Sequence, residues 1–88
     1  ALLVVEVSEA SLKTDREVKG SLYASAGIPE YWLLNLRERI LEVYREPAAD
    51  AHAVYGAVYR WRQVYAAGEQ LCPLCAPDAP LAVERLLP

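Results

Sequence analysis

The sequence predicts an α/β fold in which one strand, one helix and three further strands form a mixed sheet. A β-branched apolar run at Leu2–Val7 is typical of a central strand that is covered on both faces. Apolar residues at positions 18, 22 and 26 then follow the spacing of one helix face. Two later apolar runs are separated by only two polar residues, which indicates an antiparallel hairpin. The order strand, helix, strand favours a crossover between two parallel strands.

The helix has recognisable signals at both ends. Thr14 and Glu17 have the spacing of a capping box, so the helix is expected from Thr14 to about Ala26. Gly27 suits the position after a helix, and Pro29 prevents continuation.

The rest of the chain divides into short elements. Prolines from Pro73 onward require a tail that is extended or runs in short turns. The elements expected, in order, are strands at Glu30–Leu36 and Arg39–Arg45 joined by a turn at Arg37-Glu38, a loop at Pro47–His52, a strand at Val58–Tyr65, a turn at Gly68-Glu69, a short strand at Leu81–Val83 and a helical turn at Glu84–Leu87.

Length and composition place the chain among single globular domains. It has 88 residues, 55% of them hydrophobic and 24% charged, and a formal net charge of −3. An acidic chain grips nucleic acid only through a local basic patch. No apolar run reaches the roughly 18 residues of a membrane helix.

Two cysteines and no signal peptide predict a cytoplasmic protein. An apolar opening without methionine predicts that residues 1–88 are a single partial domain, the C-terminal portion of a longer one.

Glu6 is the anomalous residue of the first strand. It shares a face with Leu2 and Val4 in the most apolar strand of the chain. A carboxylate buried there costs several kcal/mol unless it is paired or binds a metal. Two interpretations stay open, a functional carboxylate and a residue at the solvated strand end.

Lys19 lies on the predicted helix on the same side as Asp15 and Tyr23, because the three are four residues apart. One interpretation is a surface pair between Asp15 and Lys19, worth about 0.3–0.5 kcal/mol. The other is a cation that faces the end of the Glu6 strand. The spacing by itself favours the surface pair.

Two further groups invite a functional interpretation. Cys72 and Cys75 form one CxxC, which supplies only two of the four ligands that zinc requires, and His52 is a loop residue. Arginines interleave with aromatics along the later strands, which favours an aromatic core with arginines on the wet face over a phosphate-binding surface. Those arginines are Arg37, Arg39, Arg45, Arg60 and Arg62. The residues that contact nucleic acid are not identified by this pattern.

The order of several short motifs resembles the bacterial family named Putative restriction endonuclease, a branch of the PD-(D/E)XK nuclease superfamily. The resemblance covers nearly all of the chain, and Ala26–Trp32 is its most specific segment. The motifs are Leu3–Ser8, Asp15-Arg16 with Lys19, Leu22–Ala24, Ala26–Trp32, Leu41–Arg45 and, more weakly, Gly68-Glu69, Pro73 and Pro77-Asp78.

This resemblance implies a restriction-endonuclease-like fold, a mixed sheet flanked by helices, and a Mg²⁺- or Mn²⁺-dependent endonuclease that acts on DNA. It assigns Glu6 as a catalytic residue and metal ligand, with the backbone carbonyl of Val7 as a further ligand. Ser8 stands where the superfamily usually has lysine, and Lys19 on the helix takes that catalytic role. No role follows for Glu30-Tyr31-Trp32 beyond the helix-to-strand turn and the core.

The resemblance also places a metal-binding Asp upstream of the Glu6 strand, before Ala1. With one carboxylate a cation that prefers six oxygens is held poorly, so residues 1–88 are expected to be inactive alone. The alternative is a nuclease fold that has lost its chemistry and acts by association, for example as a homodimer.

Overall fold

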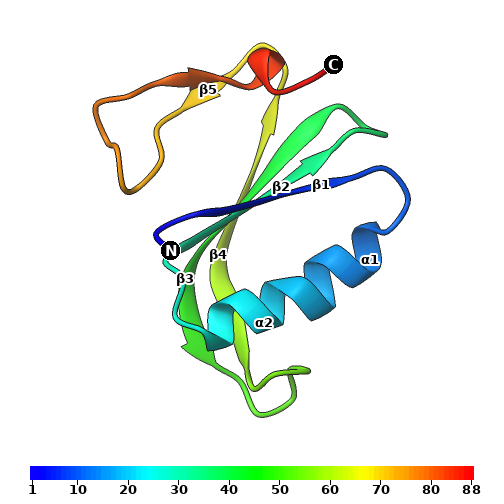
Figure 1. Cartoon of the computed structure of the whole chain (residues 1–88), viewed down its shortest axis with the longest axis vertical. Helices are drawn as coiled ribbons and strands as arrows, with labels where there is room; N and C mark the ends of the chain where they lie inside the picture. The colour runs from blue at the N-terminus through cyan, green and yellow to red at the C-terminus, as the bar shows by residue number, and fades with distance from the viewer.

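The computed structural model describes all residues, Ala1–Pro88, and contains a four-stranded mixed sheet in the order β1-β2-β3-β4. Strand β1 (Val4–Ser8) runs parallel to β2 (Glu30–Asn35), and the helix that connects them covers one face of the sheet (Figure 1). Strand β3 (Ile40–Ala49) is antiparallel to β2, and β4 (Ala57–Ala66) is antiparallel to β3. The predicted α/β class, parallel crossover and hairpin are therefore confirmed, and the sheet is consistent with a restriction-endonuclease-like fold.

The helix begins earlier than its sequence signal suggests. It comprises α1 (Leu12–Thr14), a π-helical turn (Asp15–Lys19) and α2 (Gly20–Ser25). Thr14 has helical dihedral angles and makes no capping hydrogen bond, so the predicted capping box is wrong. The extra turn forms because the Asp15 N–H donates to the Ser11 carbonyl at 2.9 Å and the Ser11 hydroxyl donates to the Asp15 carboxylate.

The C-terminal end of the helix follows its sequence signal. Gly27 has φ of 72°, a conformation that glycine adopts without a Cβ penalty. The Gly27 N–H donates to the Ala24 carbonyl and the Ile28 N–H to the Tyr23 carbonyl, the bonds of a Schellman motif. This ending directs the chain into β2.

Within residues 1–88 strand β1 lies at the edge of the sheet, whereas its composition predicts a central strand. It pairs only with β2, and Val5 and Val7 are 47% and 60% exposed. The alternation is as expected, since Val4, Glu6 and Ser8 face the helix while Val5 and Val7 point to the other side. An apolar strand therefore presents one uncovered face within residues 1–88.

Strand β3 continues through half of the segment that was expected to be a loop. Pro47 pairs with Tyr59 and Ala49 with Ala57, after Glu46 with φ of 62°. Proline is tolerated there because β2 pairs with β3 only as far as Arg45, so beyond that residue β3 has a free side. His52 lies exposed in the connection to β4, as expected.

The second face of β2 and β3 is covered by the C-terminal segment. It contains β5 (Gln70–Leu71), β6 (Leu81–Ala82) and a 3-10 turn at Val83–Arg85. A sheet flanked by helices was expected, but these short elements take the place of a helix on this face. Strand β5 escaped the sequence analysis because two residues are too few for a periodic pattern. The buried apolar cluster beneath this segment comprises Trp32, Leu34, Leu41, Val43, Leu71 and Val83. No helix has the length and hydropathy needed to cross a membrane.

The helix-side face of the sheet is built around tyrosine rings. Tyr31 is fully buried and stacks on Tyr44 with ring centroids 5.6 Å apart, and Tyr23 and Tyr59 pack around it at 5.2 and 6.2 Å. These rings hold the helix at a fixed distance above the sheet and so position its charged residues.

Candidate functional site

Glu6 and Lys19 are brought together across the helix and the sheet edge. The Lys19 ammonium lies 2.7 Å from Glu6 Oε2, and the Tyr23 hydroxyl donates to Glu6 Oε1 at 2.8 Å. Strand alternation turns Glu6 toward the helix, and the spacing of four residues puts Lys19 and Tyr23 on the helix side that meets it. The Glu6 side chain is 23% exposed, so the group is accessible to solvent.

Asp15 completes this cluster, and it is buried. Its carboxylate lies 3.2 Å from the Lys19 ammonium and accepts the Ser11 hydroxyl at 2.9 Å. Ser11 in turn lies 3.4 Å from the hydroxyl of Ser8. Asp15 and Lys19 do pair, but Asp15 is only 2% exposed, so the interpretation as a surface pair is wrong. The Tyr31 hydroxyl donates to the backbone carbonyl of Asp15 and fixes this turn from below.

The three ionised groups influence one another's pKa. Hydrogen bonds from Lys19 and then Tyr23 lower the pKa of Glu6 against the opposing effect of burial. Burial raises the pKa of Asp15, but hydrogen bonds from Ser11, Ser8 and Lys19 outweigh it and the pKa falls. The same two carboxylates raise the pKa of Lys19. At neutral pH the cluster therefore holds two negative charges and one positive charge, and the excess negative charge attracts a cation.

The cluster supplies only part of a divalent cation centre. Glu6 offers the hard carboxylate oxygens that Mg²⁺ and Mn²⁺ prefer, and Val7 has only its backbone carbonyl to offer. No group of three or more His, Cys, Asp or Glu side chains gathers at a single point. The donor set in residues 1–88 thus fits one edge of a six-oxygen site and does not complete it.

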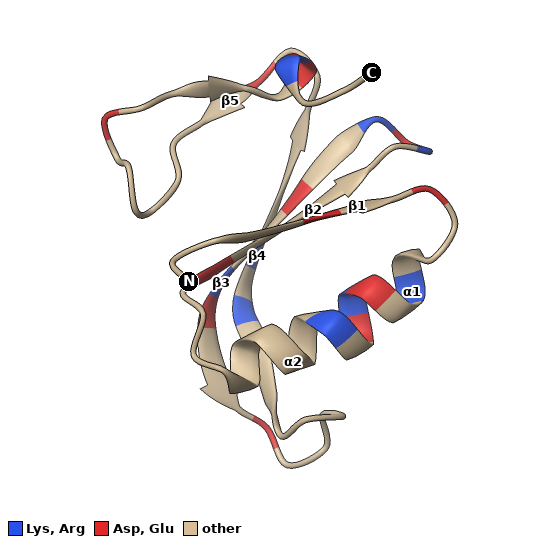
Figure 2. Ribbon diagram, viewed as in Figure 1, with Lys and Arg blue, Asp and Glu red and all other residues tan.

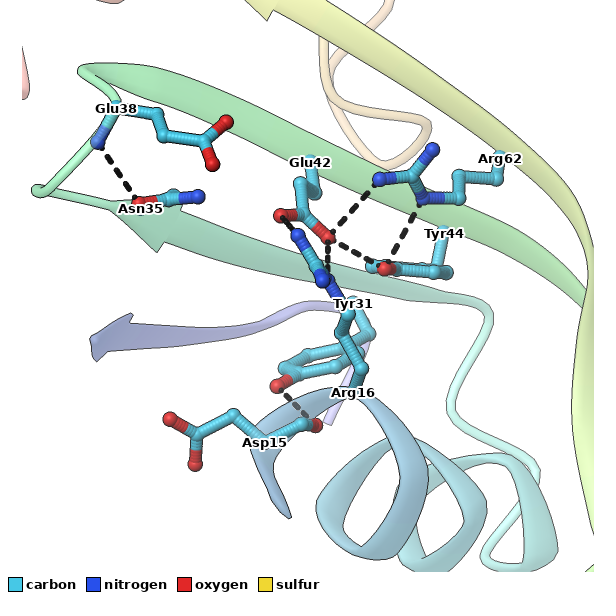
Figure 3. A network of polar contacts seen from close by, with 8 residues as sticks. All are labelled: Asp15, Arg16, Tyr31, Asn35, Glu38, Glu42, Tyr44 and Arg62. Carbon is cyan, nitrogen blue, oxygen red and sulfur yellow. Dashed lines mark hydrogen bonds and ion pairs between the residues drawn. The ribbon is translucent and has the colours of Figure 1, made fainter. Parts of the chain in front are cut away.

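A second charged network lies on the side of the helix that faces β3 and β4 (Figure 3). Glu42 is fully buried, and the Arg16 guanidinium binds its two carboxylate oxygens as a fork. Tyr44 donates to Glu42 at 2.6 Å, and Arg62 lies 3.3 Å from it. Burial raises the pKa of Glu42, but the bonds from Arg16 and Tyr44 outweigh it and lower the pKa to about 2. This network is fully partnered, which indicates a structural role.

A third pair connects the sheet to the C-terminal segment. Glu30 is fully buried and accepts Arg45 Nε at 2.7 Å and the Leu74 N–H at 2.8 Å. The Arg45 guanidinium also donates to the Cys72 carbonyl and lies 4.8 Å from the centre of the Trp61 ring. Glu30 thus has a structural role that its sequence context did not indicate.

The arginines of the later strands divide into two groups. Arg45 was expected on the solvent-exposed face, and this expectation is wrong. Its side chain is only 19% exposed and pairs with Glu30. Arg62 is half exposed and pairs with Glu42. Arg37, Arg39 and Arg60 are exposed as expected. Cys72 and Cys75 are both free thiols, and neither belongs to a group of metal-binding side chains.

Tyr23 and the burial of Asp15 are the features of the site that the sequence analysis missed. The spacing of Asp15, Lys19 and Tyr23 was visible, and it correctly placed the three on one helix side. Their common target was hidden, because only the crossover geometry shows that this side meets Glu6. Figure 2 shows the charged residues of the helix concentrated in its first half, and α2 carries none.

Comparison with known proteins identifies the family of this chain. The chain matches the family model Uma2, described as Putative restriction endonuclease, over residues 1–84. Comparisons with curated proteins and with solved structures gave no significant match. The match spans nearly the whole chain and confirms the resemblance seen in the motifs. The chain therefore belongs to the Uma2 family of restriction-endonuclease-like proteins.

Proposed function

We propose that this domain is part of a Mg²⁺- or Mn²⁺-dependent endonuclease that hydrolyses DNA phosphodiester bonds. The supporting observation is the 2.7 Å contact between Glu6 and Lys19, which joins an acidic strand residue to a helix lysine. Family membership supports a nuclease-like activity, and families of this kind generally use divalent metals. The substrate and metal are part of the proposal.

In this proposal Glu6 and the carbonyl of Val7 would hold the cation together with a carboxylate from outside residues 1–88, so these residues alone would be inactive. A bound divalent cation would neutralise charge that develops on the scissile phosphate. Lys19 keeps one N–H free of Glu6 and Asp15, and that N–H orients the attacking water or a phosphate oxygen. Tyr23 fixes the rotamer of Glu6 through its hydroxyl.

The test uses the natural protein that carries these residues, assayed for cleavage of plasmid and linear DNA with Mg²⁺ or Mn²⁺. We expect Glu6→Gln and Lys19→Ala each to lower the cleavage rate by a factor of about 100 or more. Matched controls are Glu9→Gln and Lys13→Ala, which change exposed residues of the same types near the site. Cleavage that survives Glu6→Gln at the wild-type rate would refute the assignment.

A second candidate function is association without cleavage. The observation that favours it is the open edge of β1, where Leu2, Val5 and Val7 are 64%, 47% and 60% exposed. An apolar edge strand is a template for pairing with a second chain. In this alternative the cluster around Lys19 only stabilises the helix, and the protein acts as a homodimer.

A further inference from the structure

We propose that Asp15 is a positioning residue for Lys19, and that it holds the Lys19 ammonium in place independently of Glu6. The catalytic consequence of this inference rests on the proposed function. The geometry that supports the inference does not depend on that function. Lys19 lies between two carboxylates, at 2.7 Å from Glu6 and 3.2 Å from Asp15. Asp15 differs from Glu6 in burial and in partners.

A lysine side chain needs more than one partner to be fixed at one point. Its four-carbon stem is flexible, and the Lys19 side chain is 42% exposed. Glu6 lies on an edge strand, and its carboxylate is exposed enough to bind other partners. If Glu6 engages another cation, its hold on Lys19 weakens, and a second anchor must keep the ammonium at the site.

Asp15 has the properties of that anchor. Its side chain is 3% exposed, and Ser11 holds the carboxylate oxygen that faces away from Lys19. Its backbone carbonyl accepts the hydroxyl of Tyr31, which is itself fully buried. Asp15 also begins the π-helical turn that ends at Lys19, a type of turn frequent at functional sites. The carboxylate therefore cannot move with the Lys19 side chain.

A purely structural role for Asp15 makes a different prediction. If Asp15 only supports the first helical turn, asparagine serves as well, because its amide oxygen still accepts the Ser11 hydroxyl. The placement of Lys19 would then be unchanged. If Asp15 positions Lys19, Asp15→Asn keeps the helix but releases the ammonium, because a neutral amide attracts a cation weakly.

The first readout needs no nuclease activity. Lys13 and Lys19 are the only lysines of residues 1–88, so acetylation by limiting acetic anhydride gives a Lys19 to Lys13 ratio with an internal reference in each molecule. Lys13 is exposed and lies in α1, between Ser11 and Asp15 in the sequence. Measured by mass spectrometry on the natural protein, we expect the ratio to rise about threefold or more in Asp15→Asn. Asp15→Glu, which keeps the charge, should raise the ratio less than Asp15→Asn.

The second readout is kinetic. Asp15→Asn should lower kcat for DNA cleavage by roughly 10- to 100-fold while KM stays at its wild-type value, because positioning acts on the reacting groups and leaves DNA binding intact. Ser11→Ala, which removes the hydroxyl that donates to the Asp15 carboxylate at an exposed position, should raise the labelling ratio by a smaller factor. This variant keeps the test decisive if Asp15→Asn fails to fold, as judged by circular dichroism.

The outcomes separate the two proposals. A wild-type labelling ratio in folded Asp15→Asn, or in Ser11→Ala if Asp15→Asn does not fold, overturns the positioning role, even if Glu6→Gln abolishes cleavage and the nuclease function stands. A raised ratio in a protein that cleaves no DNA supports the positioning role and refutes the nuclease function. A raised ratio with a lower kcat supports both.

Discussion

At the scale of single residues, burial distinguishes structural carboxylates from those available to a ligand. Glu42 is fully buried, yet Arg16, Tyr44 and Arg62 satisfy its carboxylate oxygens. A buried carboxylate without such partners would become protonated or unfold the site. Glu6 has a similar set of partners but keeps an exposed fraction, and that exposure makes it available for chemistry.

Glu42 should make the stability of the domain depend on acid pH. Its pKa is about 2 in the folded chain against 4.5 for the free group, so its ionised form is stabilised by folding. This contribution, about 3 kcal/mol, is complete above pH 4.5 and is lost as the pH falls toward 2. Between pH 7 and pH 3 the wild type should lose about 2 kcal/mol more than Glu42→Gln in urea unfolding.

A matched control for that experiment is Glu9→Gln, since Glu9 is exposed and has no hydrogen-bond partner. It should retain the full pH dependence of the wild type. Parallel unfolding curves for wild type and Glu42→Gln across this pH range would contradict the assignment of the low pKa to Glu42.

At the scale of elements, the crossover from β1 through the helix to β2 creates the site. Parallel pairing of β1 and β2 fixes the height of the helix, and the tyrosine rings beneath it fix the distance. The first half of the helix thereby meets Glu6 on one side and Glu42 on the other. One short helix thus connects a candidate active site to a buried structural network.

The C-terminal segment is held by the Glu30–Arg45 pair as well as by apolar packing. Removing Arg45 leaves Glu30 fully buried with the Leu74 N–H as its remaining partner, which should cost about 3 kcal/mol or more. In Arg45→Ala the Leu74 amide should exchange with deuterium far faster than in the wild type. Arg45→Lys should fall between, because it keeps the charge and loses the fork.

Arg60→Ala is the control for this loss, since Arg60 is an exposed arginine of the neighbouring strand without a charged partner. It should leave the exchange of Leu74 unchanged. Equal protection of Leu74 in Arg45→Ala would show that the apolar contacts of Leu71 and Val83 hold the segment by themselves.

At the scale of the whole molecule, the edge of β1 is open to a second chain, since β1 pairs only with β2 within residues 1–88 and Val5 and Val7 are exposed. If the edge pairs between copies, the wild type should sediment as a dimer, and Val5→Lys with Val7→Lys should shift it to monomer. Both positions are exposed, so the substitutions should leave the fold intact, while edge lysines oppose strand pairing.

Val54→Lys, at a valine that is 63% exposed in the loop before β4, is the control for added charge. A wild-type chain that sediments as a monomer at tens of micromolar would remove the homodimer from consideration and leave the nuclease proposal unaffected.

The sequence by itself determined the order of the elements, the parallel crossover, the hairpin and the face on which Glu6 lies. These follow from local patterns: the β-branched run, the period of 3.6, the glycine after the helix and the two-residue gap. The order of the motifs also indicated the family, and the family model that matches residues 1–84 confirms it.

Only the tertiary structure decided that β1 is an edge strand, that Pro47 lies within a strand and that Asp15 is buried against Lys19. Each depends on which strand lies alongside or which layer lies above, and neighbours distant in sequence leave no local periodic signal. For the same reason, the local sequence pattern does not distinguish the role of Glu42 from that of Glu6. Both are acidic residues in apolar strands, and only the packed arginine of the helix shows that Glu42 is a structural carboxylate.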